Sequence, residues 1–142
     1  MNIAFFLMPK NCVAFLQDDF TLRQGLEKMR HHHYTAVPVI TKDGKYAGTV
    51  SEGDFLWDLV DRQTGNDNKT VIKSAEHDTV KTIIKKDRNP PVSITATMED
   101  LLVRVMNQNF VPVVDDNGSF IGIVTRRDVI KYFYDASTAP VK

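Results

Sequence analysis

Two short motifs in this sequence combine a hydroxyl group with a carboxylate three positions later. The first is Ser51-x-x-Asp54 and the second is Thr125-x-x-Asp128. Each stands between an apolar run and an amphipathic one, which places it between a strand and a helix. The plain interpretation is a helix capping box. The same geometry also suits anion binding, because a helix N-terminus presents unpaired N–H groups and a partial positive charge.

The residues inside the two motifs differ in charge. The first motif encloses Glu52-Gly53 and the second encloses Arg126-Arg127. A carboxylate repels phosphate, whereas guanidinium groups pair with it through charge-assisted hydrogen bonds. We therefore expect the second motif to be the stronger phosphate site. In the alternative interpretation, the two arginines are solvated surface charges or form a salt bridge in a dimer.

Both motifs belong to a longer internal repeat. Val37-Pro38-Val39-Ile40 and Val111-Pro112-Val113-Val114 match at the same offset as the motifs themselves. Upstream, Thr21 and Thr97 each precede apolar residues at i, i+4 and i+7, which predicts two capped amphipathic helices. Turn residues then join pairs of apolar runs, which predicts β-hairpins. The expected hairpin strands are residues 37–40 with 46–50, and residues 111–114 with 120–124.

The repeat predicts the fold class and the division of the chain. Each copy has the order strand, helix, strand, strand, helix, with the last helix beginning near Asp54 or Asp128, so we expect an α+β fold of two units. The predicted boundaries are 8–62 for the first unit, 63–88 for a connecting segment and 89–134 for the second unit. Within the connection, Asp61 to Lys69 is polar and suits an exposed link. Val71 to Arg88 could hold a further helix, which Asn89-Pro90-Pro91 would end.

The paired pattern resembles a known family. Each copy, Tyr34 to Asp54 and Phe110 to Asp128, begins with an apolar strand that contains a proline. It continues through Gly48 or Gly122 to the hydroxyl and carboxylate motif. Together the copies resemble a tandem CBS-domain pair, or Bateman module, over residues 8 to 134. The resemblance implies two units packed through their sheets with pseudo-two-fold symmetry. It also implies an adenine nucleotide as ligand, which is AMP, ADP, ATP or cyclic di-AMP. The aspartate of the motif would accept hydrogen bonds from the ribose hydroxyls.

The same resemblance implies a slot for the base. Its candidate residues lie before each hairpin and on the short strand that precedes each first helix. In the first copy they are Val13, Ala14, Phe15, Tyr34, Thr35, Ala36 and Pro38; in the second they are Val92, Ile94, Asn109, Phe110, Val111 and Pro112. Three short strings, Val13-Ala14-Phe15, Tyr34-Thr35-Ala36 and Thr125-Arg126-Arg127, are similar to stand-alone receptors for cyclic di-AMP. Tyr34 could stack on a base, reach a phosphate or simply pack.

Bulk composition limits the function classes. The chain has 142 residues, with 18 basic and 18 acidic side chains, so it has no room for a separate catalytic domain and no basic excess for nucleic acid. Its longest apolar stretch near the N-terminus, Ile3 to Met8, is too short to span a membrane. We expect a cytoplasmic protein, in which the single Cys12 forms no internal disulfide.

These features predict a regulatory binding protein that is not an enzyme. We expect no catalytic residues, no metal ligands and no covalent cofactor, while the sequence leaves Mg²⁺ open. His31-His32-His33 point in three directions on a helix and are expected to end it. A homodimer through the second helices and a regulated partner protein complete the prediction. The apolar residues expected at the dimer interface are Phe55, Leu56, Trp57, Tyr132, Phe133 and Tyr134.

A second function class remains open from the sequence. The chain could be a structural or nucleic-acid-associated accessory module that does not sense nucleotides. The supporting feature is a basic run of Lys81, Lys85, Lys86 and Arg88, which Asp87 interrupts. The run has no interleaved aromatic residues on which bases could stack.

Overall fold

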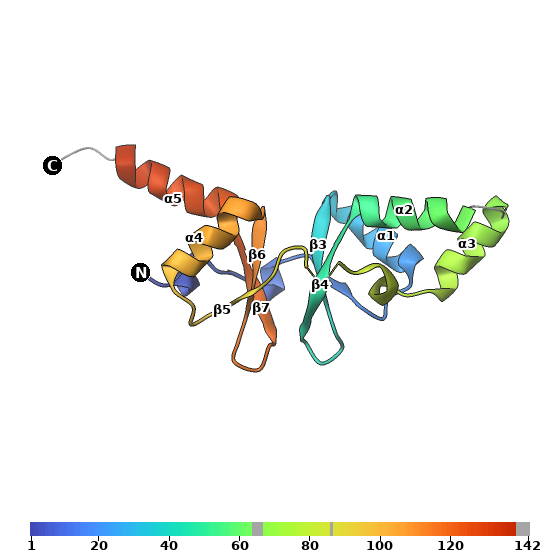
Figure 1. Cartoon of the computed structure of the whole chain (residues 1–142), viewed down its shortest axis with the longest axis horizontal. Helices are drawn as coiled ribbons and strands as arrows, with labels where there is room; N and C mark the ends of the chain where they lie inside the picture. Colours follow the sequence, from blue (N-terminus) through green and yellow to red (C-terminus); the bar gives the residue numbers. More distant parts are fainter. Residues whose placement is uncertain (64–66, 86, 139–142) are drawn as a thin grey trace. The chain divides into compact units, whose positions relative to one another are not determined.

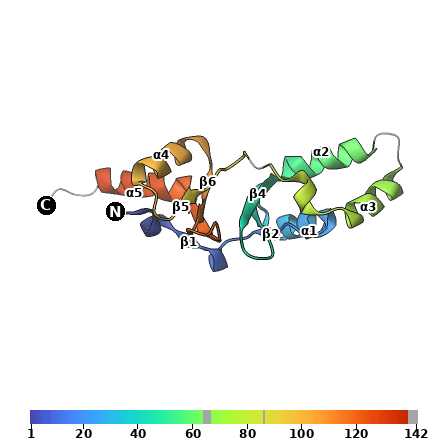
Figure 2. The same cartoon turned by 60° about the horizontal axis from the view of Figure 1, so that its bottom comes forward.

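The computed structural model describes residues 1–63, 67–85 and 87–138 (Figures 1 and 2). Over these residues it contains five α-helices and two β-sheets, which confirms the predicted α+β class. Packing divides the chain into two units. The first-repeat unit is Ala14–Arg88, and the second-repeat unit combines Met1–Val13 with Asn89–Lys142. None of the described helices is long and apolar enough to cross a membrane.

The first-repeat unit has a three-stranded sheet with helices on one side of it (Figure 1). The strand order is β2-β3-β4; β2 pairs in parallel with β3, and β3 and β4 form the predicted hairpin. Its elements are β2 (Leu16–Gln17), α1 (Leu22–His32), β3 (Ala36–Ile40), β4 (Tyr46–Ser51), α2 (Glu52–Gln63), α3 (Asn68–His77) and the 3₁₀ helix η3 (Val80–Ile83).

The second-repeat unit repeats this order on a four-stranded sheet, β1-β7-β6-β5. Here β5 is parallel to β6, and β6 and β7 form the second predicted hairpin. Its elements are η1 (Ile3–Phe6), β1 (Met8–Pro9), η2 (Lys10–Cys12), β5 (Val92–Ser93), α4 (Met98–Asn107), β6 (Phe110–Val114), β7 (Phe120–Thr125) and α5 (Arg126–Thr138).

The first helix of each unit begins as predicted. The Thr21 hydroxyl accepts the Gln24 N–H at 3.1 Å, and the Gln24 side chain accepts the Thr21 N–H at 2.9 Å. Thr97 and Asp100 form the same reciprocal pair at 3.1 and 3.2 Å. Both capping boxes satisfy N–H groups that would otherwise lack a partner at the helix start.

The N-terminal segment packs on the second repeat and not on the first, which the sequence did not indicate. The side chain of Ile3 is fully buried in the core of the second-repeat unit. Strand β1 pairs antiparallel with β7, with Met8 opposite Ile123 and Pro9 opposite Gly122. A Cβ at Gly122 would collide with the Met8 carbonyl, and the φ of +156° at Gly122 also favours glycine. The outer edge of β7 is therefore covered by the first strand of the chain.

A segment of the connection covers the equivalent edge of β4 in the first-repeat unit. Lys85 donates its N–H to the Thr49 carbonyl at 3.2 Å. Immediately before it, Ile84 lies so close to Gly48 that a Cβ on the glycine would collide with the isoleucine side chain. The predicted connecting segment therefore packs as part of this unit.

The helix predicted within Val71 to Arg88 was wrong in its extent. Helix α3 begins earlier, at Asn68, and ends at His77, and a separate 3₁₀ turn follows. The chain leaves the helix because the Val80 N–H donates to the Phe20 carbonyl at 2.8 Å instead of bonding within a helix. Part of the predicted exposed link Asp61 to Lys69 belongs to α2 and α3, and its residues 64–66 lie outside the described residues.

Candidate functional site

The hydroxyl and carboxylate motifs lie at the junctions where β4 enters α2 and β7 enters α5. Both helices begin earlier than predicted, at Glu52 and Arg126, because the hydroxyl residue caps each helix. The Asp54 N–H donates to the Ser51 hydroxyl at 3.3 Å, and the Ser51 N–H donates back to the Asp54 carboxylate at 2.8 Å. This arrangement confirms the capping interpretation at the first motif.

The second motif has the same hydroxyl cap with a less constrained carboxylate. The Asp128 N–H donates to the Thr125 hydroxyl at 3.2 Å. Over the described residues, the reciprocal bond from the Thr125 N–H to the Asp128 carboxylate is not formed. The Asp128 carboxylate therefore keeps acceptor capacity that Asp54 uses for its own backbone.

The segment before each hairpin lies directly beside the motif of the same repeat. The Glu52 N–H donates to the Thr35 carbonyl at 2.9 Å, and the Arg126 N–H donates to the Asn109 carbonyl at 2.8 Å. Strand pairing also sets Phe110 opposite Thr125. The fold thus brings two parts of each predicted site together although they are distant in the sequence.

Asp54 is already engaged by a cation. The guanidinium of Arg88 donates to both carboxylate oxygens, with NH2 at 3.1 Å from Oδ1 and NH1 in closer contact with Oδ2. The Asp54 side chain is only 7% exposed. Burial alone would raise the pKa of Asp54, but the hydrogen bonds from Arg88 and Ser51 outweigh it and hold the pKa below its ordinary value. The first carboxylate is therefore ionised and paired at neutral pH.

Asp128 has no such partner among the residues that the structure describes. No ion pair among the described residues includes Asp128, and Asp128 is only partly buried. The nearest equivalent of the Arg88 segment is Met8 to Val13, which covers β7; its cation is Lys10, which forms no ion pair with Asp128. The two carboxylates therefore differ in availability as well as in surroundings.

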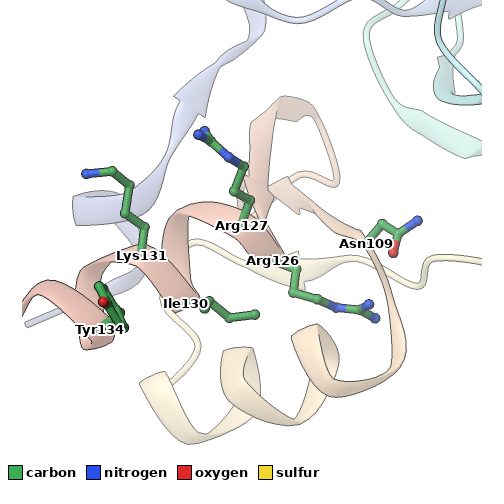
Figure 3. A pocket seen from close by; sticks show the side chains of 6 residues that line it. All are labelled: Asn109, Arg126, Arg127, Ile130, Lys131 and Tyr134. Atoms are coloured by element: carbon green, nitrogen blue, oxygen red, sulfur yellow. The ribbon is translucent and has the colours of Figure 1, made fainter. Parts of the chain in front are cut away.

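An open pocket lies beside the second motif on one face of α5 (Figure 3). Its volume is about 660 Å³. The lining residues are Asn109, Arg126, Arg127, Ile130, Lys131 and Tyr134. In Figure 3 the side chains of Arg126 and Arg127 leave the start of α5 in different directions. Positive charge is thus spread along this face and does not converge at one point.

A family model for the CBS domain matches the chain twice, over residues 7–61 and 75–135. The chain belongs to the CBS-domain family. Among proteins with a similar sequence, an uncharacterized protein of Methanocaldococcus jannaschii is 28% identical over 88% of this chain and 87% of its own length. The family assignment confirms the resemblance inferred from the repeated motifs.

Solved structures of other CBS proteins share the fold. CbpB in complex with c-di-AMP has a TM-score of 0.83 at 24% identity, covering 95% of this chain and 85% of that one. CBSX2 of Arabidopsis thaliana in complex with AMP has a TM-score of 0.71 at 22% identity, covering 96% of this chain and 98% of that one. At these identities the likeness establishes the fold.

The predicted base-slot residues divide between the two CBS repeat units. Ala14, Phe15 and the residues from Tyr34 to Pro38 lie in the first-repeat unit, whereas Val13 packs with the second. Tyr34 is 48% exposed, and its ring is stacked near that of His32. The Phe15 ring lies under the Lys28 ammonium group, 5.0 Å from the ring centroid. The Tyr34 side chain is thus available to a ligand on the surface of its own unit.

Several base-slot candidates of the second CBS repeat are already used by the fold. Val111 is fully buried and Val92 nearly so, both in the core, so their side chains are not available to a ligand. The Phe110 carbonyl accepts the Asn89 amide at 2.9 Å and the Gln108 amide at 3.1 Å. Ile94 packs against the core, and the strand residues Pro38 and Pro112 are buried. Asn109 is the candidate of this group that lines the pocket.

Three residues on the same face of α5 were not predicted to lie at the site, although Tyr134 was expected at a dimer interface. Lys131 lies four positions after Arg127, and Ile130 and Tyr134 follow Arg126 at the same spacing. Residues four apart share a helix face, so this spacing could have identified them. Lys131 donates to Asp135 at 3.0 Å, an exposed pair that a stronger anion could displace.

The histidine run ends α1, as expected. The helix stops at His32, and His33 adopts the left-handed conformation with φ of 58°. Imidazole rings at a helix C-terminus lie close to carbonyl groups that favour positive charge. Over the described residues, no group of three His, Cys, Asp or Glu side chains could hold a metal ion.

Proposed function

We propose that this CBS protein is a regulatory sensor of an adenine nucleotide, and that the nucleotide binds at the second motif. The observation that carries the proposal is the contrast between the two aspartates. Arg88 occupies both carboxylate oxygens of Asp54, whereas Asp128 has no ion-pair partner over the described residues. The AMP and c-di-AMP bound in the CBSX2 and CbpB structures support the class of ligand.

Each group at the second motif has a chemical role in this proposal. The Asp128 carboxylate accepts hydrogen bonds from the two hydroxyls of a ribose, since an ionised carboxylate can accept from both. The N-terminus of α5 and the exposed Arg127 attract phosphate. Arg126 and Lys131 add positive charge along the neighbouring pocket, whose lining residues do not include Asp128. AMP, ADP and ATP supply both the diol and the anion that these groups require, whereas each ribose of cyclic di-AMP offers Asp128 a single free hydroxyl.

The proposed output is a change in how the protein packs or which partner it binds. A ligand can drive such a change only through different affinities for two arrangements. Exposed apolar side chains offer surfaces for a homodimer or a regulated protein. They are Leu56, Trp57 and Val60 on α2, and Ile130, Phe133 and Tyr134 on α5. Phe55, which we expected on such a surface, is instead 2% exposed and belongs to the core.

The alternative hypothesis, that the protein is a nucleic-acid-associated module, rests on a basic run in which one cation is already paired. Arg88 belongs to the basic run but is paired with Asp54. A cation that is already paired contributes little to phosphate binding, because its counterion must first be displaced. We therefore propose a binding protein without catalytic activity, located in the cytoplasm, whose ligand is a small nucleotide.

The proposal is tested by nucleotide binding to single variants. Asp128→Ala and Arg127→Ala are each expected to weaken binding of AMP or cyclic di-AMP by about tenfold or more, because each removes a charge-assisted contact. Asp54→Ala is expected to change affinity by no more than about twofold. Asp116→Ala, an exposed acid in the second hairpin turn, is the matched control for charge. Equal losses at Asp54 and Asp128 would refute the asymmetry.

A further inference from the structure

Arg88 lies where a ligand of the first motif would have to bind. Its guanidinium bonds to both oxygens of Asp54, the atoms that would otherwise accept ribose hydroxyls. We infer that Arg88 keeps the first motif closed, so that the chain has one open nucleotide site and one latent site that opens when Arg88 leaves Asp54. This inference rests on the proposed function and adds a means of regulating it.

The backbone before Arg88 holds the guanidinium in this position. The Lys85 N–H donates to the Thr49 carbonyl at 3.2 Å, and Ile84 fits against Gly48. The Arg88 N–H also donates to the Lys85 carbonyl at 3.4 Å. Ile84 and Lys85 therefore lie along the edge of β4, and three residues later Arg88 pairs with Asp54 at the start of α2. These backbone contacts keep Arg88 near Asp54.

The pairing can nevertheless open. The Arg88 side chain is 37% exposed, while Asp54 is 7% exposed, so water reaches the cation but hardly reaches the carboxylate. A guanidinium that stays partly solvated within the ion pair is held less strongly than a fully buried one, so it can move away at a modest cost. Asp54 can leave its cation only if another donor replaces it, because an unpaired buried carboxylate is unfavourable. Ribose hydroxyls are such donors.

Opening also depends on what the incoming ligand offers to Arg88. A ligand with hydroxyl groups alone must replace two hydrogen bonds between ionised partners with two in which only the carboxylate is charged. Within the motif, Glu52 adds a negative charge where Arg126 stands in the second copy. Both features favour the closed state. Arg88 donates to both Asp54 oxygens, so Arg88→Ala should free them for ribose hydroxyls, while Glu52 keeps the affinity for phosphate below that of the second motif.

The experiment counts nucleotide sites by calorimetry with AMP and cyclic di-AMP. The wild type is expected to bind at one motif, and Asp128→Ala should weaken that binding by about tenfold or more. Adding Arg88→Ala to Asp128→Ala is expected to restore a site with affinity at least about tenfold above that of Asp128→Ala alone. Adding Asp54→Ala should remove it again. Arg23→Ala, which breaks an exposed ion pair with Glu76 in the same unit, is the matched control.

The outcomes separate this inference from the proposed function. If the wild type fills both motifs, or if the Asp128→Ala, Arg88→Ala double variant binds no nucleotide, Arg88 does not close the site. If the wild type binds nothing, the proposed open site is refuted, while Asp54-dependent binding by Arg88→Ala would still support closure. Thermal unfolding confirms that each variant is folded, and Arg88→Gln replaces Arg88→Ala if the alanine variant does not fold.

Discussion

Arg126 donates its Nε–H to the backbone carbonyl of Val105 at 2.7 Å. Val105 lies in the last turn of α4, where carbonyl groups lack helical partners and attract positive charge. Arg127, the next residue, is exposed. Two adjacent arginines that look equivalent in the sequence therefore have different roles, and only Arg126 supports the fold of its unit.

Stability measurements should separate the two arginines. Arg126→Ala is expected to lower the free energy of unfolding by about 1 kcal/mol, because one charge-assisted hydrogen bond to α4 is lost. The melting temperature should fall by about 3 to 6 °C. Arg127→Ala should leave it within about 1 °C while weakening nucleotide binding. Comparable melting shifts for both variants would show that the contact with Val105 contributes nothing.

Gly122 should tolerate no side chain. In Gly122→Ala the new Cβ would meet the Met8 carbonyl and come within 2.9 Å of the Leu7 side chain, so β1 must move. We expect a loss of about 2 to 3 kcal/mol in chemical unfolding. Gly53→Ala is the control, since its nearest neighbour, the Ser51 hydroxyl, would lie 3.6 Å away. That variant should be neutral or more stable by about 0.5 kcal/mol.

The third residue of the chain should behave as a core residue. Ile3 is fully buried, so Ile3→Ala is expected to lower the free energy of unfolding by about 2 to 3 kcal/mol through lost apolar contacts and the cavity left behind. Met106→Ala serves as the comparison, because Met106 is 77% exposed and its truncation should cost less than about 0.5 kcal/mol. An Ile3→Ala variant as stable as the wild type would mean that the N-terminal segment does not pack on the second repeat.

The Asp54 and Arg88 pair should make stability depend on pH. Because the pKa of Asp54 is lowered in the folded state, its contribution is fully present above the unfolded value of about 3.9 and is lost as the pH falls through the folded pKa. At neutral pH the pair is expected to contribute about 1 kcal/mol, a modest value because Arg88 is partly solvated.

Urea unfolding of the wild type and Arg88→Ala between about pH 7 and pH 3 measures this contribution. The difference in free energy between the two proteins should be largest near neutral pH and shrink below about pH 4. Arg23→Ala is the control, because the side chains of both Arg23 and its ion-pair partner Glu76 are exposed. A difference that stays constant over the whole range would rule out ionised Asp54 as the partner of Arg88.

The local structure could be predicted from the sequence because its signals are local. The Thr21 and Thr97 boxes, the spacing of apolar residues and the turn residues of each hairpin all act within a few positions of one another. The two hydroxyl and carboxylate motifs were placed correctly at strand-to-helix junctions for the same reason. The internal repeat strengthened the prediction of the fold, since the same order of elements occurred twice.

Contacts between distant segments could not be predicted in this way. Nothing near Arg88 in the sequence indicates that it pairs with Asp54, because the pairing depends on how the segment after η3 follows β4. The packing of Ile3 on the second repeat is hidden for the same reason. Val111 is a candidate for the base slot whose apolar side chain lies in the core, as is common for a strand residue between buried neighbours.

The most direct measurement is isothermal titration calorimetry of the wild-type protein with AMP, ADP, ATP and cyclic di-AMP, paired with the same titrations of Asp128→Ala. We predict that at least one of these nucleotides binds the wild type and that Asp128→Ala weakens its binding by about tenfold or more. Binding of cyclic di-AMP alone would identify a receptor for that messenger, and preference for a linear nucleotide would identify a sensor of energy state. No binding of any of the four to the wild type would contradict the proposed function.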